Sequence, residues 1–111
     1  MGSIWVNMSV TLDGVVQAPA RADEDTRGGF THGGWGQGYH DEVAMQEASA
    51  GMSRPGAMLL GRRTWQDFTT IWGKATDSNP FSAHMNATQK YVVSRTLDNV
   101  AAWSNSILPR G

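Results

Sequence analysis

The stretch MLLGRRTW (residues 58–65) places two arginines and a threonine directly after a short apolar run. A guanidinium group presents several N–H donors in a fork that suits phosphate oxygens. Gly61 separates the apolar run from Arg62 and Arg63, and glycine lets a backbone approach a ligand closely. If a helix begins here, its unpaired N–H groups and its dipole add positive character. The corner therefore predicts a phosphate site, although two arginines that pair with Asp67 or only face solvent would explain the same pattern.

A second run, YVVSRTL (residues 91–97), repeats this arrangement, because its apolar part ends at Ser94 and Arg95. If residues 57–60 and 90–94 are neighbouring parallel strands, their carboxyl ends lie at one sheet edge, where ligands bind in open α/β sheets. The three arginines and the serine hydroxyl would then converge. Such a set matches a nucleotide that carries an extra ribose phosphate.

The elements that would position these residues alternate between strand and helix along the chain. Strands are predicted at residues 4–10, 57–60, 90–94 and around 100–108, helices at 42–53, 64–72 and 81–88, and a long loop at 15–40. The helix at 64–72 is favoured by Trp65, Phe68 and Trp72, which fall on one stripe at helical spacing. Alternation of this kind predicts an α/β domain with a largely parallel sheet flanked by helices.

The loop is rich in glycine, which occupies six of the eleven residues from 28 to 38. The pattern G-x-G-x-x-G is absent, so a flexible lid is favoured over a phosphate cradle. Trp35 within it either folds back on a pocket or stacks on a ligand, and the sequence favours neither. Asp41 is placed to cap the helix that follows. The residues of that helix that are expected to face a core are Met45, Ala48 and Met52.

Composition limits the kinds of partner. Nine basic residues against ten acidic ones argue against a nucleic-acid surface and against an anionic membrane anchor. The absence of cysteine excludes disulfides and thiolate metal sites, and adjacent His40, Asp41 and Glu42 would point apart, so no metal site is predicted. No apolar run reaches the length of a membrane-spanning helix. We therefore expect a small-molecule partner and a cytoplasmic location.

The apolar content predicts a thin core. Leu, Ile, Val and Phe account for 19 of 111 residues, which is low for one complete domain. A thin folded domain, or part of a larger one, fits better than disorder, because net charge is low and there are five tryptophans.

Four segments resemble the dihydrofolate reductase superfamily, in the branch related to the reductase domain of the bifunctional riboflavin-biosynthesis deaminase–reductase. They are MSVTLDGVVQAP, HGGWGQGYHDE, MLLGRRTWQDF and KYVVSRTL, in that order. The resemblance runs from about residue 4 to the end of the chain. It implies a dihydrofolate-reductase-like α/β domain over residues 1–111, truncated at its C-terminus, because family domains continue further.

The resemblance also implies an activity. It is the NADPH-dependent reduction of a small heterocyclic or carbonyl-type substrate, such as the pyrimidine of the riboflavin pathway, and relatives often form dimers. Cofactor binding is implied for Gly14, Gly61, Arg62, Arg63, Thr64, Ser94 and Arg95, of which Arg95 would select NADPH over NADH. Asp13 and Asp41 would orient the substrate or relay a proton, and Trp35 would face the substrate pocket.

Two other classes of function remain open. One is a nucleotide-binding module without turnover, which predicts NADPH affinity but no reductase activity. The other is an inactive truncated fragment that acts only structurally or in an oligomer, since exposed sheet edges favour self-association.

Overall fold

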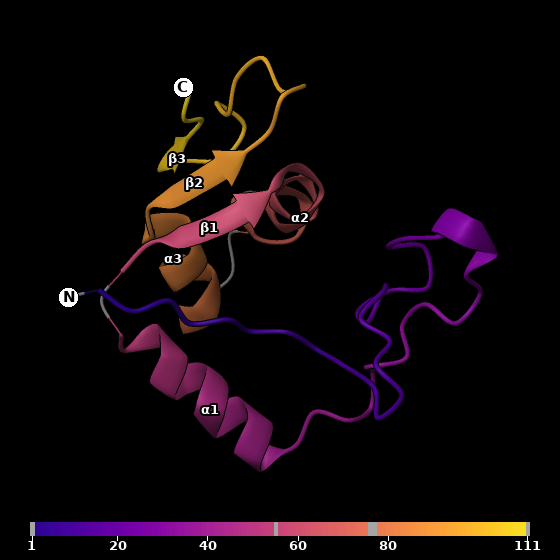
Figure 1. Ribbon diagram of the computed structural model, residues 1–111. Coiled ribbons are helices and arrows are strands. Elements are labelled where there is room, and N and C mark those ends of the chain that lie inside the picture. The colour runs from indigo at the N-terminus through magenta and orange to yellow at the C-terminus, as the bar shows by residue number, and fades with distance from the viewer. Residues whose placement is uncertain (1, 55, 76–77, 111) are drawn as a thin grey trace. The chain divides into compact units, whose positions relative to one another are not determined.

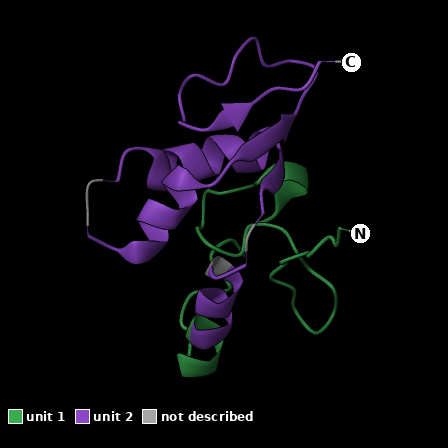
Figure 2. Ribbon diagram, turned by 90° about the vertical axis from the view of Figure 1, so that its left-hand side faces the viewer, with its two compact units in different colours: residues 1–45 green, residues 46–111 purple. Residues whose placement is uncertain are grey.

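The computed structural model describes residues 2–54, 56–75 and 78–110 (Figure 1). The chain divides into two compact units, residues 1–45 and 46–111 (Figure 2). The second unit is α/β, with a small parallel sheet, as the alternation of predicted elements indicates. No helix of the described part is long and apolar enough to cross a membrane.

The second unit holds three parallel strands in the order β1-β2-β3 (Figure 1). Its elements are β1 (Met58–Gly61), α2 (Arg62–Phe68), the π-helix η2 (Thr69–Gly73), α3 (Pro80–Ala87), β2 (Lys90–Val93) and β3 (Ser106–Ile107). The predicted strands at 57–60 and 90–94 and the predicted helices at 64–72 and 81–88 are confirmed, with ends shifted by a few residues. The fourth strand is present only as the two residues of β3.

Local sequence explains where the helices begin and change. Asn79 caps α3, because its Oδ1 accepts a hydrogen bond from the Phe81 N–H at 2.9 Å, and Pro80 occupies the first turn, where it is tolerated. The hydroxyls of Thr69 and Thr70 each donate to a backbone carbonyl one turn earlier. Such bonds compete with the regular α-helical ladder, and α2 changes to a π-helix at these two residues.

The core of the second unit lies between one face of the sheet and its helices. Its buried members are Trp65, Met85, Val92 and Trp103. Partly buried apolar side chains that pack around them are Met58, Leu60, Phe68, Trp72, Phe81, Leu97, Val100 and Leu108. The opposite sheet face is exposed and carries Leu59, Tyr91, Val93 and Ile107. This one-sided core accords with the low content of large aliphatic residues.

Lys90 is fully buried at the start of β2, which is unusual for a lysine. Its ammonium group donates to the backbone carbonyls of Met85 at 2.7 Å and Thr88 at 2.8 Å, and lies 4.2 Å from the centre of the Trp103 ring. These carbonyls belong to the end of α3 and the residue after it, where helical carbonyls lack partners. The lysine therefore ties α3 to β2 and to the segment before β3.

The predicted strand at residues 4–10 is wrong, since residues 2–10 belong to no helix or strand of the described chain. Figure 1 shows them as an elongated trace (indigo). Their side chains suit a strand, but a strand exists only when a neighbouring backbone completes its hydrogen-bond ladder. All three strands of the described chain lie in the second unit.

The glycine-rich loop is folded back on itself through backbone hydrogen bonds. The N–H of Gly34 donates to the Ala18 carbonyl and that of Gly36 to the Pro19 carbonyl, both at 2.8 Å. A Cβ on Gly33 would lie 2.5 Å from the Ala22 carbonyl oxygen. Glycine is therefore required at this position because two backbone segments approach closely.

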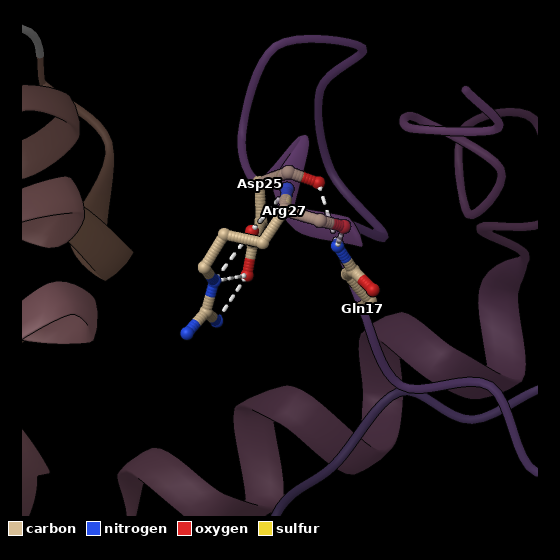
Figure 3. A network of polar contacts seen from close by, with 3 residues as sticks. All are labelled: Gln17, Asp25 and Arg27. Atoms are coloured by element: carbon tan, nitrogen blue, oxygen red, sulfur yellow. Dashed lines mark hydrogen bonds and ion pairs between the residues drawn. The ribbon is translucent and has the colours of Figure 1, made fainter. Parts of the chain in front are cut away.

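Charged residues within this loop hold a short turn together. Figure 3 shows Arg27 against the Asp25 carboxylate, with Nε donating at 2.8 and 3.0 Å and Nη2 closing the ion pair. Gln17 donates from Nε2 to the backbone carbonyls of both residues, at 3.0 Å each. The turn contains the 3-10 helix η1 (Arg27–Gly29). These charges serve the local fold of the first unit.

Helix α1 (Glu42–Met52) confirms the helix predicted at 42–53. Asp41 caps it as predicted, because its Oδ1 accepts from the Ala44 N–H at 2.9 Å. The expectation that its apolar stripe faces a core is wrong at Met45, which is 66% exposed, and at Ala48, which is also exposed. The helix is rich in alanine and offers few large side chains to bury. The side chain of Met52, the third residue of that stripe, lies outside the described residues.

Candidate functional site

The carboxyl ends of β1 and β2 meet at one edge of the sheet. The two strands are parallel, and Gly61 is paired with Val93 in their register. The residues that follow them in the chain, Arg62 and Ser94, therefore start from the same level of neighbouring strands. This arrangement is the one that the two apolar runs predict, and it is the position where open α/β sheets bind ligands.

The two arginines after β1 differ in their surroundings. Arg62 is half-buried and donates from Nη1 to Oε1 of Gln66, one helical turn away, at 3.2 Å. Arg63 is exposed, and within the described residues it makes no hydrogen bond or ion pair. The alternative in which the arginines pair with Asp67 is therefore not observed for these two side chains. Arg63 keeps all its donors available to a ligand or to solvent.

After β2, the side chain of Ser94 organises a turn. Its Oγ accepts hydrogen bonds from the backbone N–H groups of Thr96 and Leu97, both at 3.1 Å. The Ser94 and Thr96 hydroxyl oxygens also lie 3.4 Å apart, and either hydroxyl can donate to the other. Arg95 lies between the bonded residues, is exposed, and has no ion pair with any described carboxylate. The turn thus holds the Ser94 hydroxyl in a fixed position beside the Arg95 guanidinium in the sequence.

An open hollow of about 320 Å³ lies at this turn. Its lining residues are Val93, Ser94, Arg95 and Pro109. Arg62 and Arg63 are outside this lining, so the structure separates the predicted phosphate residues into two groups along one sheet edge. Sequence reasoning missed Pro109, because nothing in its local pattern signals that the segment after β3 reaches the end of β2. Gly61 and Thr64 remain with the first group, at the start of α2.

Asp13 and Gly14 form a turn in the first unit. Thr11 donates from its hydroxyl to Oδ1 of Asp13 at 2.6 Å, and the Gly14 N–H donates to the Thr11 carbonyl at 3.0 Å. Gly14 has φ of 89°, in the left-handed region that glycine adopts without strain. The Thr11 hydroxyl, followed by the backbone N–H of Asp13, lowers the pKa of this carboxyl below its ordinary value of 3.8. Asp13 is therefore ionised at neutral pH and can accept a hydrogen bond from a ligand.

The remaining predicted site residues have local structural partners. Trp35 donates from its indole N–H to the Gln17 carbonyl at 2.7 Å and is half-buried, so it folds back on its own unit. Asp41 is exposed at the start of α1, where its side chain is the helix cap. These two residues, with Asp13 and Gly14, belong to the first unit, whereas the strand-end residues belong to the second.

Within the described residues, no group of three or more His, Cys, Asp or Glu side chains could hold a metal ion. Comparison with known proteins found no match to a family model or to a curated protein. The geometry of the sheet edge is therefore the basis for a functional assignment.

Proposed function

We propose that the carboxyl edge of the sheet binds the phosphates of a nicotinamide dinucleotide, and that the chain provides this part of an NADPH-dependent reductase. The observation that carries the proposal is the register of β1 and β2, which sets Gly61 level with Val93. Two strand ends that are each followed by arginine thus share one edge. The proposed substrate is a small heterocyclic or carbonyl-type compound, and the proposed fold is dihydrofolate-reductase-like.

The donor set fits phosphate groups. Arg95 and the Ser94 hydroxyl line the hollow, and both can donate to phosphate oxygens. The hollow is open and small, so it suits a phosphorylated ribose better than a whole dinucleotide. Arg63 lies in the first turn of α2, after β1, and its N–H groups donate to no described residue. We assign the ribose phosphate of NADPH to Arg95 and Ser94, and the pyrophosphate to the group formed by Gly61, Arg62, Arg63 and Thr64.

When bound, NADPH supplies a hydride, and the protein's part is to hold and orient the reactants. Asp13 is proposed as a hydrogen-bond acceptor that orients substrate, since its lowered pKa disfavours the protonated form at neutral pH. Asp41 is proposed for the same role in addition to capping α1. Trp35 is proposed to line the substrate pocket with a face of its indole ring. The hydrogen bond from its N–H to the Gln17 carbonyl holds the ring in position.

A nucleotide-binding module without turnover is the second candidate. It is favoured by the chemistry of the hollow, whose lining consists of an apolar residue, a proline, a serine and an arginine. None of these is a general acid or base at neutral pH. This candidate predicts the same nucleotide affinity but no oxidation of NADPH when pyrimidine or pterin substrates are added.

The test is a titration of the 111-residue chain with NADPH and, in parallel, NADH, read by energy transfer from its tryptophans. The variant Arg95→Ala should weaken NADPH binding by about tenfold or more, because a hydrogen bond to a charged group contributes about 1.5–3 kcal/mol. NADH affinity should be nearly unchanged, since NADH lacks the extra phosphate. Added salt should weaken NADPH binding in the wild type more than in the variant.

Lys74→Ala is the matched control, because it removes one exposed positive charge from the second unit away from the strand ends. It should leave the ratio of NADPH to NADH affinity as it is in the wild type. If Arg95→Ala also leaves this ratio unchanged, the role assigned to Arg95 is wrong. If neither nucleotide binds the wild-type chain, the nucleotide site itself is wrong for this chain.

A further inference from the structure

The hollow at the end of β2 opens where the pairing of β2 with β3 stops. The last pair of that register is Tyr91 with Ile107. Two residues further along each segment are Val93 and Pro109, which both line the hollow. Pro109 has no backbone N–H and cannot donate to a further rung of the ladder. The hydrogen bonds of the sheet therefore do not hold Pro109 at the wall of the hollow.

Arg110, the next residue, makes a contact that reaches back to the segment after β2. Its Nη2 donates to the backbone carbonyl of Asp98 at 2.7 Å. Asp98 directly follows the turn that the Ser94 hydroxyl closes by accepting two backbone N–H groups. The hydrogen bond therefore joins the neighbour of Pro109 to the segment that carries Ser94 and Arg95.

The contacts of Arg110 distinguish a positioning role from a ligand role. A direct phosphate ligand would line the hollow, as Arg95 does, but Arg110 is not one of the lining residues. Its guanidinium is instead engaged with a backbone carbonyl, which is a strong acceptor. An arginine held in this way acts on a ligand through the residue that it places, and Pro109 is both its neighbour in the chain and part of the lining.

We propose that Arg110 is a positioning residue for the hollow. Its hydrogen bond to Asp98 holds Pro109 at the wall, so that the hollow keeps a width that accepts a phosphate group. This role rests on the proposed function, in which the hollow takes the ribose phosphate of NADPH. Without the bond, the segment after β3 keeps the packing of Leu108 against the core but moves more freely at Pro109. Arg110 therefore affects the preference for NADPH and contributes little to the stability of the second unit.

Backbone NMR relaxation of the free 111-residue chain tests the hydrogen bond without nucleotide. In Arg110→Met the donor is lost, and the order parameter of the amide of residue 110 should fall from about 0.85 toward about 0.6. Arg110→Lys keeps a cationic donor and should stay near the wild type. Lys74→Met removes an exposed charge elsewhere in the second unit and should leave this order parameter unchanged. Equal mobility of residue 110 in the wild type and in Arg110→Met would show that the bond does not hold the segment.

The ratio of NADPH to NADH affinity tests whether the bond serves the hollow. Arg110→Met should lower this ratio by about fivefold, the scale of one lost hydrogen bond, and Arg110→Lys should restore most of it. Pro109→Gly removes the wall while Arg110 keeps its charge, and this variant should lower the ratio to a similar extent. In the double variant, the change at Arg110 should add almost nothing, because residues that act through one another are not additive. A ligand role of Arg110 predicts instead that the two losses multiply.

Three results would overturn the role of Arg110. The first is an Arg110→Met variant that keeps the wild-type ratio of NADPH to NADH affinity while the wild type prefers NADPH, which leaves the proposed function standing. The second is multiplication of the two losses in the double variant. The third is a lower urea midpoint in Arg110→Met, because the loss of affinity would then reflect the fold of the unit. If the wild type binds neither nucleotide, the proposed function fails and this role fails with it.

Discussion

At the scale of single residues, a side chain's neighbours decide what chemistry it can offer. Ser94 accepts two backbone hydrogen bonds at its hydroxyl oxygen to close a turn, and this oxygen also lies 3.4 Å from that of Thr96. Asp41 and Trp35 likewise have structural partners that their sequence positions only partly reveal. The residue type determines which donor and acceptor groups a side chain has. Its local hydrogen bonds determine which of these groups remain available to a ligand.

The Thr11–Asp13 contact gives a prediction at this scale. Replacing the hydroxyl in Thr11→Val removes the strongest cause of the lowered carboxyl pKa, so the pKa of Asp13 should rise toward 3.8. The ionised carboxylate stabilises the wild-type turn above that pH, and this stabilisation is lost as pH falls through the lower folded pKa. An NMR titration of the Asp13 carboxyl carbon measures the shift. Thr31→Val, at an exposed position, is the control, and an Asp13 pKa that is the same in both variants contradicts the assigned cause.

At the scale of elements, short helices and strands depend on contacts with one another. Helix α3 has eight residues, and β2 has four, which is too few for either to be stable alone. Lys90 joins them, because its ammonium donates to carbonyls at the end of α3 while its backbone belongs to β2. Sequence patterns predicted both elements but gave no sign of this link.

Replacing this lysine should destabilise the second unit. In Lys90→Met the carbonyls of Met85 and Thr88 lose a buried donor, and the free energy of unfolding should fall by about 2 kcal/mol. Urea denaturation measures the change, and the exposed Lys74→Met should lie within about 0.5 kcal/mol of the wild type. Equal loss in both variants, or no loss in either, would show that the buried donor does not support α3.

The stability difference between the wild type and Lys90→Met should also depend on pH, in a direction that the pKa of Lys90 determines. Burial lowers the pKa of the Lys90 ammonium below 10.5, so the unfolded chain binds more protons than the folded chain just below that pH. Stability rises with pH wherever this holds. The stability advantage of the wild type over Lys90→Met should therefore increase as pH approaches 10.5.

At the scale of the whole molecule, the two units differ in what holds them together. The second unit has a cluster of buried aromatic and aliphatic side chains, whereas Ala18 is the one buried apolar residue among residues 2–45, the described part of the first unit. The first unit is organised mainly by loop hydrogen bonds, such as those of Gly34, Gly36 and Trp35. Regions with few buried apolar contacts open at lower free energy than packed cores.

Hydrogen exchange should show this difference. Amides of β1 and β2 should be strongly protected, and amides of residues 4–10 should exchange at nearly the unprotected rate in dilute solution. Strong protection of this segment would contradict the assignment of residues 2–10 to no helix or strand.

Much of the second unit was predictable from sequence. The apolar runs at 57–60 and 90–94, and the stripe of Trp65, Phe68 and Trp72, specified strands and a helix because their periods match the geometry of those elements. Their parallel pairing was predicted because parallel strands need a crossover connection, and the helices between the two runs provide one. The strand-end position of Arg62 and Arg95 was predicted for the same reason.

The sequence by itself determined the local elements and the cap at Asp41, because these depend on the periodicity and chemistry of neighbouring residues. The meeting of the two arginine-bearing strand ends was predicted from the crossover that the helices between them provide. Only the tertiary structure decided that Pro109 joins the hollow, that Lys90 is buried, that the glycines serve close packing and that residues 4–10 lack a ladder. These features depend on which distant segments meet. Hydrogen-bond partners and burial are properties of that meeting, and no local pattern encodes them.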